Sequence, residues 1–403
     1  MGSTERVSRA GAGISGNSHP AGAAAEACRA ALDAAQAEPT AAFLFATVDH
    51  GAALPELVDA ASQVLGVAPV GASAAGVMIG GVAREGGPGV AVLALSGIEA
   101  EPFLLSGMAG GEARAGEVLR HQLDAPVGPG DLVVLFPDPL SVSPAALLAS
   151  LEPALDGAAV VGAGAVDGPG VPPVQWAEGE IASGAVAGMV IRGAHAPGAA
   201  RIGVTQACRP LGPPQKVTRS DGHWVLEIDG RPALDVFREV ARGPLAEDLR
   251  RAASYVLVAL PDPADPETSL RHGDYRVRNV AGFSDASNGR AGFALPEPVR
   301  SGDRIAFVLR EPHGAREDLK RMLGALPAGD AAFGIYLDCC ARGAALFDVP
   351  GLEAAYLQEA LGPLPLVGML GAYEIGPVRG RSELLTYTGV LALGGGAQGQ
   401  ALA

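Results

Sequence analysis

Apolar strands and amphipathic helices alternate along the chain in an order that recurs. The first copy begins with "AAFLFATV" at residues 41–48, which has the length and composition of a buried strand. Residues 55–66 follow as an amphipathic helix, because apolar residues between Leu57 and Leu65 recur at helical spacing. "APVGASAAG" at 68–76 predicts a strand that breaks into a glycine turn, and 89–97 predicts a further strand.

The same order of elements occurs twice more. In the second copy the strand is "DLVVLFPDPL", the helix "SPAALLASLEPALDG", the strand and turn "AAVVGAGAVDG", and the last strand "GAVAGMVIRG". The third copy reads "AAFGIYLDCCARG", "PGLEAAYLQEALG", "LPLVGMLGAYEIGP" and "TYTGVLALGG". Duplication of one unit and independent use of the same α/β order both explain this pattern.

A different pattern separates the second and third copies. Residues 216–240 predict a hairpin around Asp221-Gly222 followed by a helix, and 255–311 predict several antiparallel strands. We therefore expect an α/β fold of repeated β-α-β-β units with mixed sheets, in two closely packed domains. The expected limits are a flexible lead (1–20) with an Ala-rich helix in 1–37, domains at 38–237 and 238–395, and a tail at 396–403.

Composition and charge exclude several classes of protein. The net charge of −15 among 403 residues opposes a nucleic-acid surface, which needs clustered Lys and Arg. No apolar run is long enough to span a bilayer, and the N-terminus lacks a secretory signal, so we expect a cytoplasmic protein. The four cysteines form no C-x-x-C pattern, and we expect no metal and no cofactor.

Several segments resemble the FIST family (F-box and intracellular signal transduction). They are "APVGASAAG", "KVTRSDGHWVLEIDGRPALDVF" and "DCCARG…LPLVGMLGAYEIGP…TYTGVL", in the order of a FIST N-terminal domain and its C-terminal partner. The resemblance covers roughly residues 38–395. The most specific part is the Cys-x-Arg-Gly loop, a helix with Glu353 and a Glu-Ile-Gly-Pro turn.

The resemblance implies a sensory module that binds a small ligand, with a free amino acid as the candidate. Because no F-box, kinase or cyclase pattern accompanies the two domains, the signalling partner is expected in trans. No catalysis is assumed.

Arg342 and Glu374 are the first candidate ligand-binding residues. A carboxylate can accept an ammonium group and a guanidinium can grip a carboxylate. The alternative is that the two side chains pair with each other and only fix their loops. Glu353 is expected on the solvent face of its helix or capping that helix. Tyr373 is included because it is the aromatic residue near Met369 and Leu370, where the family leads us to expect one.

Two further groups of residues are candidates. Gly71, Ser73 and Gly76 form a turn whose backbone N–H groups could cradle an anion, or which only needs glycine torsions.

Cys339 and Cys340 end a strand, so one sulfur is expected in the core and the other on the loop side. They could be inert small hydrophobes, or one could be a thiolate activated by Arg342. A cysteine-dependent hydrolase or acyl transferase that uses Cys339 or Cys340, and a protein-protein adaptor without a metabolite, are the alternative functions.

Overall fold

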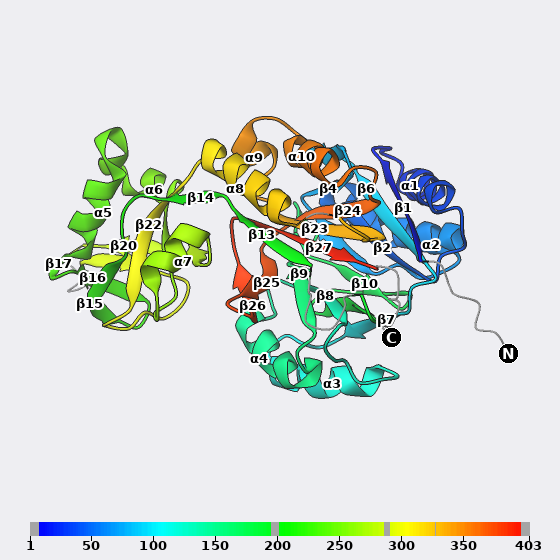
Figure 1. Ribbon diagram of the computed structural model, residues 1–403, viewed down its shortest axis with the longest axis horizontal. Helices are drawn as coiled ribbons and strands as arrows, with labels where there is room; N and C mark the ends of the chain where they lie inside the picture. The colour runs from blue at the N-terminus through cyan, green and yellow to red at the C-terminus, as the bar shows by residue number, and fades with distance from the viewer. Residues whose placement is uncertain (1–7, 195–200, 286–290, 327, 396–403) are drawn as a thin grey trace, which may run out of the picture. The chain divides into compact units, whose positions relative to one another are not determined.

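A computed structural model describes residues 8–194, 201–285, 291–326 and 328–395 of the chain (Figure 1). Two compact units are present. The larger unit holds the described residues up to Val204, Lys320–Leu384 and those from Thr388 onward. The smaller unit holds Thr205–Leu319 and Leu385–Tyr387. Both units combine helices with sheets, which confirms the predicted α/β class.

Three modules with one element order account for the larger unit. In each module a strand and a helix are followed by a central strand, a second helix, a neighbouring strand, a two-stranded hairpin and a last strand. The three predicted copies correspond to the later part of each module, so the repeated pattern is confirmed and extends further toward the N-terminal side.

The bounds of the elements are as follows. Module I consists of β1 (Arg9–Ser15), α1 (Pro20–Ala35), β2 (Ala41–Thr47), α2 (Leu54–Leu65), β3 (Gly71–Ala74), β4 (Gly76–Ile79), β5 (Val82–Glu85) and β6 (Val90–Ser96). Module II consists of β7 (Ala100–Leu105), α3 (Ala115–Gln122), β8 (Leu132–Pro137), α4 (Pro144–Leu155), β9 (Ala159–Ala163), β10 (Gln175–Ala177), β11 (Glu180–Ala182) and β12 (Val186–Ile191). Module III consists of β13 (Ile202–Gln206), α8 (Pro312–Ala325), β23 (Phe333–Cys339), α10 (Leu352–Leu361), β24 (Leu366–Gly371), β25 (Glu374–Val378), β26 (Arg381–Leu385) and β27 (Thr388–Gly394). Short helices η1 (Val48–Ala53), η2 (Glu112–Arg114) and α9 (Ala344–Phe347) lie in the connecting loops.

Each module completes its sheet with a hairpin taken from another module. The three sheets have the orders β1-β6-β2-β3-β10-β11, β26-β25-β9-β8-β12-β7 and β13-β27-β23-β24-β4-β5. Module II therefore lends its hairpin to module I, module I to module III, and module III to module II. This cyclic exchange explains why residues from both ends of the chain share one unit.

Three equivalent backbone hydrogen bonds mark the exchange. Val166 N donates to Ser73 O, Ala372 N to Gly164 O, and Ala75 N to Leu370 O, at 2.9 to 3.0 Å. Each donor stands two residues after the acceptor of its own module. The bonds thus set a common register, in which Ser73, Gly164 and Leu370 occupy one position of the three modules.

The two faces of each sheet have different neighbours, because side chains alternate along a strand. On the outer face of module I, Leu44 and Ala46 pack in one core cluster with α1 and α2. On the inner face, Phe43 and Phe45 contact Phe136 of module II, with centroids of the Phe45 and Phe136 rings 5.2 Å apart. Burial on both faces explains the continuous apolar run of β2.

The predicted flexible lead is wrong for residues 9–15. These residues form β1, which pairs antiparallel with β6 along its whole length. A Cβ atom on Gly11 or Gly13 would lie 2.1 to 2.2 Å from carbonyl oxygens of α1, so glycine lets the helix lie close to the strand. Small residues therefore serve close packing here. The Ala-rich helix is confirmed as α1, and residues 1–7 and the tail 396–403 lie outside the described residues.

The smaller unit is inserted into module III, since the chain leaves that module within β13 and returns within α8. Its sheet has the order β19-β18-β22-β15-β16-β21-β20, with β14 paired to β22 and β17 to β16. The elements are β14 (Cys208–Pro210), β15 (Gln215–Asp221), β16 (Trp224–Ile228), β17 (Arg231–Pro232), α5 (Ala233–Ala241), η3 (Gly243–Ala246), α6 (Leu249–Ala252), β18 (Val256–Leu260), α7 (Pro266–His272), β19 (Arg276–Arg278), β20 (Gly282–Ser284), β21 (Gly292–Ala294) and β22 (Arg304–Arg310). The predicted hairpin around Asp221-Gly222 is confirmed by the pairing of β15 with β16.

The predicted domain limits differ from the boundaries of the two compact units. They separate the chain at residues 237 and 238, whereas the compact units exchange strands between early and late segments. The limits from the sequence describe consecutive domains of a family, and they remain a prediction.

Candidate functional site

The Cys-x-Arg-Gly loop follows β23, and its arginine is fully buried. Residues 340–343 turn the chain between the end of β23 and the start of α9. Arg342 N donates to Cys339 O at 2.8 Å, which closes the turn. Gly343 then takes a φ of 52°, a left-handed conformation that favours glycine. This turn directs the Arg342 side chain back toward α10.

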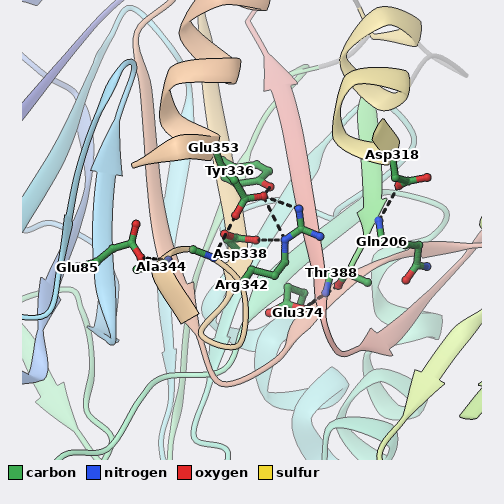
Figure 2. Close-up of polar contacts among 11 residues, drawn as sticks. Glu85, Gln206, Asp318, Tyr336, Asp338, Arg342, Ala344, Glu353, Glu374 and Thr388 are labelled. Carbon is green, nitrogen blue, oxygen red and sulfur yellow. Dashed lines mark hydrogen bonds and ion pairs between the residues drawn. The ribbon is translucent and has the colours of Figure 1, made fainter. Parts of the chain in front are cut away.

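Arg342 lies between two acidic side chains (Figure 2). Its Nε atom is 2.8 Å from Asp338 Oδ1, and its Nη2 atom contacts Glu353 Oε1. Tyr336 Oη donates to the same Glu353 oxygen at 2.9 Å. Tyr336 and Asp338 share the outer face of β23, because they stand two residues apart on a strand. We refer to Tyr336, Asp338, Arg342 and Glu353 as the ion cluster.

The ion cluster contains two buried carboxyl groups and one guanidinium, so it can be neutral only if it holds one extra proton. Burial raises the pKa of Asp338 well above its usual range, and repulsion by Glu353 adds to this effect. Burial would also raise the pKa of Glu353, but Arg342 and hydrogen bonds from Asp338, Arg342 and Tyr336 lower it. Burial thus favours the neutral form of Asp338, whereas Arg342 favours the ionised form of Glu353.

A carboxylate from module I supports the loop between β23 and α10. Glu85, at the end of β5, accepts hydrogen bonds from Ala344 N at 2.6 Å and from Gly351 N at 2.9 Å. The hairpin exchange brings this residue to module III. Sequence reasoning missed Glu85, because nothing in the sequence indicates which module receives the β4–β5 hairpin.

Glu374 is fully buried at the start of β25. Its Oε2 atom accepts hydrogen bonds from Thr388 Oγ1 at 2.7 Å and Thr388 N at 3.3 Å (Figure 2). Its Oε1 atom has no hydrogen-bond partner among the described residues. Burial raises the pKa of Glu374 well above its usual range, Cys339 adds to this, and the Thr388 hydrogen bonds partly offset it.

The alternative in which Arg342 and Glu374 pair with each other is wrong, and so is the expected position of Glu353. Arg342 pairs with Asp338 and Glu353, while Glu374 is bonded to Thr388. Glu353 is buried, although a solvent-facing or capping role was expected. The reason is the alternation of faces: Asp338 lies on the outer face of β23 beneath α10, and the next residue, Cys339, lies on the inner side with Glu374.

The two cysteines divide as expected. Cys339 is buried and Cys340 is exposed. The pKa of Cys340 is lowered, chiefly because the Cys339 side chain is hydrogen-bonded to it. Burial and the carboxyl groups of Glu374 and Asp338 act in the opposite direction. The neighbour that lowers the pKa of Cys340 is therefore the second cysteine, and the alternative of activation by Arg342 has no support in these contacts.

Tyr373 lies beside Glu374 and is also buried. Its ring packs on Gly164, where an added Cβ would come within 2.8 Å of the ring. Its hydroxyl has no hydrogen-bond partner among the described residues, and burial raises its pKa. Tyr373 is thus a second polar group of the β24–β25 turn without a hydrogen-bond partner in the described part of the chain.

The candidate anion cradle lies in buried strands. Gly71 begins β3 and Gly76 begins β4. Ser73 N donates to Val174 O, and Ser73 Oγ donates to Val166 O and accepts from Val174 N. Gly71 is needed for close approach, because an added Cβ would lie 1.8 Å from Leu44 O. The expected glycine torsions are absent, since neither glycine has a positive φ.

The common register identifies Gln175, which sequence reasoning missed, and His50, which the sequence offers as the least implausible histidine partner of a cysteine hydrolase because it lies in the equivalent loop of the first copy. Gln175 pairs with Ala72, as Glu374 pairs with Ala163, so both occupy one position of the lent hairpins. Gln175 is fully buried and neither amide atom has a partner among the described residues. By the same register, buried His50 stands where module III has Arg342. An alignment of the three copies through their hairpins would have found both.

Neither a metal site nor a membrane-spanning helix is found among the described residues. Within it, no group of three or more His, Cys, Asp and Glu side chains could hold a metal ion. None of its helices has both the length and the apolar content needed to cross a membrane.

Two family models match successive parts of the chain. The family model of the FIST N domain matches residues 40–231, and that of the FIST C domain matches residues 233–377. An uncharacterized protein of Mycobacterium tuberculosis is 30% identical over 393 residues, which covers 96% of this chain and 99% of the relative. An uncharacterized protein of Mycobacterium bovis is 32% identical over 395 residues, covering 96% of this chain and 98% of the relative.

Proposed function

The chain belongs to the FIST family, and from this premise we propose that it is a sensory protein whose signal depends on a small ligand bound beside Glu374. FIST domains are associated with signal transduction. We propose that a ligand binds and that its site lies beside Glu374. A free amino acid is the candidate ligand.

The observation that carries the proposal is the unpartnered Oε1 atom of Glu374. Buried polar atoms in folded proteins nearly always have a hydrogen-bond partner, and leaving one without a partner costs about 1–3 kcal/mol. Thr388 occupies only the other oxygen of this carboxyl group. A ligand ammonium group would supply both the missing donor and the charge that favours the ionised carboxylate.

Arg342 supplies the second contact of the proposal. Its Nη1 atom is buried and has no hydrogen-bond partner among the described residues, although Nε and Nη2 are engaged in the ion cluster. Arg342 also interacts electrostatically with Glu374. The carboxylate of an amino acid would accept from Nη1, which gives one acceptor and one donor for the two charged ends of the ligand.

The signalling partner is proposed to be a separate protein. We also propose that the protein acts in the cytoplasm. The two family matches take up residues 40–377, and both are FIST domains. In this proposal a ligand-dependent change is transmitted to another chain.

A thermal-shift screen against the free amino acids and related small metabolites tests the proposal. A true ligand at about 100 times its Kd stabilises the protein by roughly 2.7 kcal/mol. Glu374→Gln removes the negative charge while keeping the shape, and it should abolish the shift. Glu152→Gln is the matched control, because Glu152 is exposed and paired with Arg381.

Two results would contradict the proposal. If no compound in the panel raises the unfolding midpoint, ligand sensing by this chain loses its support. If a compound does so equally in Glu374→Gln and Arg342→Lys, the ligand binds elsewhere.

A further inference from the structure

The end of β23 places two thiols of different accessibility in contact. Cys339 is 4% exposed, whereas Cys340 is exposed to solvent. The two residues are consecutive in the chain, and a hydrogen bond from Cys339 lowers the pKa of Cys340. The exposed thiol therefore has a second, buried thiol on the adjacent residue.

We propose that Cys339 and Cys340 are a peroxide-reactive dithiol, in which Cys340 is the attacking residue and Cys339 the resolving residue. The co-reactant is hydrogen peroxide. This modification is independent of the ligand proposed for Glu374, although it takes place next to that residue.

The reaction balances in two steps. The Cys340 thiolate attacks one peroxide oxygen, the O–O bond breaks, and Cys340 becomes a sulfenic acid while the other oxygen leaves as water after protonation. The Cys339 sulfur then attacks the Cys340 sulfur, the S–O bond breaks, and a second water leaves. Two thiols are oxidised to one disulfide and one hydrogen peroxide is reduced.

The disulfide would be strained and therefore easily reduced. Adjacent Cα atoms across a trans peptide are about 3.8 Å apart, below the roughly 4.4–6.8 Å usual for disulfides. The peptide is also held on both sides, since Cys340 N donates to Gly371 O and Arg342 N donates to Cys339 O, each at 2.8 Å. Strained, exposed disulfides have high reduction potentials, which suits a reversible modification.

The other cysteines provide internal references. Cys28 is buried against α2, where its sulfur lies 4.0 Å from Ala61 O, and burial raises the pKa of its thiol to about 12. Cys208 is buried in the smaller unit. Neither combines an exposed sulfur with a second thiol, so the proposal predicts oxidation at Cys340 first.

The test uses the full chain, reduced and then freed of reductant, with limiting hydrogen peroxide as the probe. Alkylation followed by intact and peptide mass spectrometry should show a loss of two hydrogens confined to the Cys339–Cys340 peptide, reversed by dithiothreitol. Cys340→Ser should abolish that product. Cys339→Ser, or Cys339→Ala if the serine variant folds poorly, should leave a sulfenic acid on Cys340 that dimedone traps. Cys28→Ser should behave as the unmodified chain does.

Three results would overturn the proposal. One is oxidation of Cys28 or Cys208 before Cys340. Another is a Cys340 sulfenic or sulfinic acid in the unmodified chain while Cys339 stays reduced. The third is a disulfide that joins Cys340 to another molecule. Each result is independent of whether any amino acid binds, so failure here leaves the Glu374 test unaffected.

Discussion

Module III buries more ionisable acidic groups than basic ones. Three carboxyl groups, those of Asp338, Glu353 and Glu374, are buried there with one guanidinium, that of Arg342. Isolated buried charges are costly, so the group can be stable only if protons or ligands balance it. Burial raises the pKa of both Asp338 and Glu374, which favours the neutral form of each carboxyl group.

Glu374→Gln should change the dependence of stability on pH. Because the pKa of Glu374 is raised in the folded state, that state binds more protons than the unfolded chain above about pH 4.3, and stability falls as pH rises. The variant lacks this loss, so its stability relative to the unmodified chain should increase with pH, by up to about 1.4 kcal/mol per pH unit until the folded pKa is passed. Urea unfolding at several pH values between 5 and 8 measures the difference.

Glu152→Gln serves as the control for this pH series, because that carboxylate is exposed. A stability difference for Glu374→Gln that stays constant between pH 5 and 8 would contradict the raised pKa. Asp338 has the same sign of effect, so the unmodified and the variant chains should both retain some loss of stability with pH.

The ion cluster should be replaceable as a whole but not in part. Arg342→Met leaves Glu353 as a buried unpaired charge and is expected to cost about 3–5 kcal/mol. Adding Tyr336→Phe, Asp338→Ala and Glu353→Leu should recover most of the lost stability, because well-packed apolar groups often stabilise a fold as much as a buried ion pair does. Urea unfolding of both variants checks this; a fourfold variant less stable than Arg342→Met alone would show that the cluster itself stabilises the fold.

At the scale of elements, close backbone approach explains several glycines. The parallel pair β2–β3 brings Leu44 O to the point where a Cβ on Gly71 would lie, and the contact of β1 with α1 makes the same demand on Gly11 and Gly13. Such contacts leave no sign in local propensity, since the partner backbone belongs to another element. They account for the incorrect expectation of a flexible lead over residues 9–15.

Gly71→Ala should therefore destabilise the larger unit. The added methyl group would overlap Leu44 O, and overpacking of this kind costs about 1–3 kcal/mol or more. Gly282→Ala is the matched strand control, because an added Cβ there meets nothing within 4 Å. Chemical unfolding of the two variants gives the comparison, and equal stabilities would refute the close approach.

At the scale of the whole molecule, the two compact units have separate cores. Phe136 packs between modules I and II of the larger unit, while Phe237 packs with Phe283, Phe293 and Phe307 in the smaller unit. Units with their own cores can unfold as separate cooperative transitions. The covalent insertion of one unit into module III does not require them to melt together.

Calorimetry should therefore resolve two unfolding transitions. Phe136→Ala removes a buried ring from the larger unit and should lower only the midpoint of that unit, since such losses cost about 3–5 kcal/mol. Phe237→Ala should lower only the midpoint of the smaller unit. A single transition that both variants lower equally would mean that the units unfold as one.

The elements of each copy were determined by local sequence. Apolar runs, helical spacing and capping residues act within a few positions, so β2, α2, β8, α4, β23 and α10 follow the predicted order, and the α/β class with mixed sheets is confirmed. The family resemblance was also visible in short motifs such as "DCCARG" and "AYEIGP".

Tertiary structure alone decided which copies exchange hairpins and which buried charges meet. The partner of a lent hairpin is fixed by edges that form only after three modules assemble, so the modules that receive Glu85 and Gln175 could not be assigned from local pattern. Arg342 was singled out from its loop motif, and the structure places it fully buried, while its role in a site stays a prediction. Its partners were mistaken, because a one-residue step along β23 separates the face of Asp338 from that of Cys339, and only the packed α10 shows where Glu353 lies.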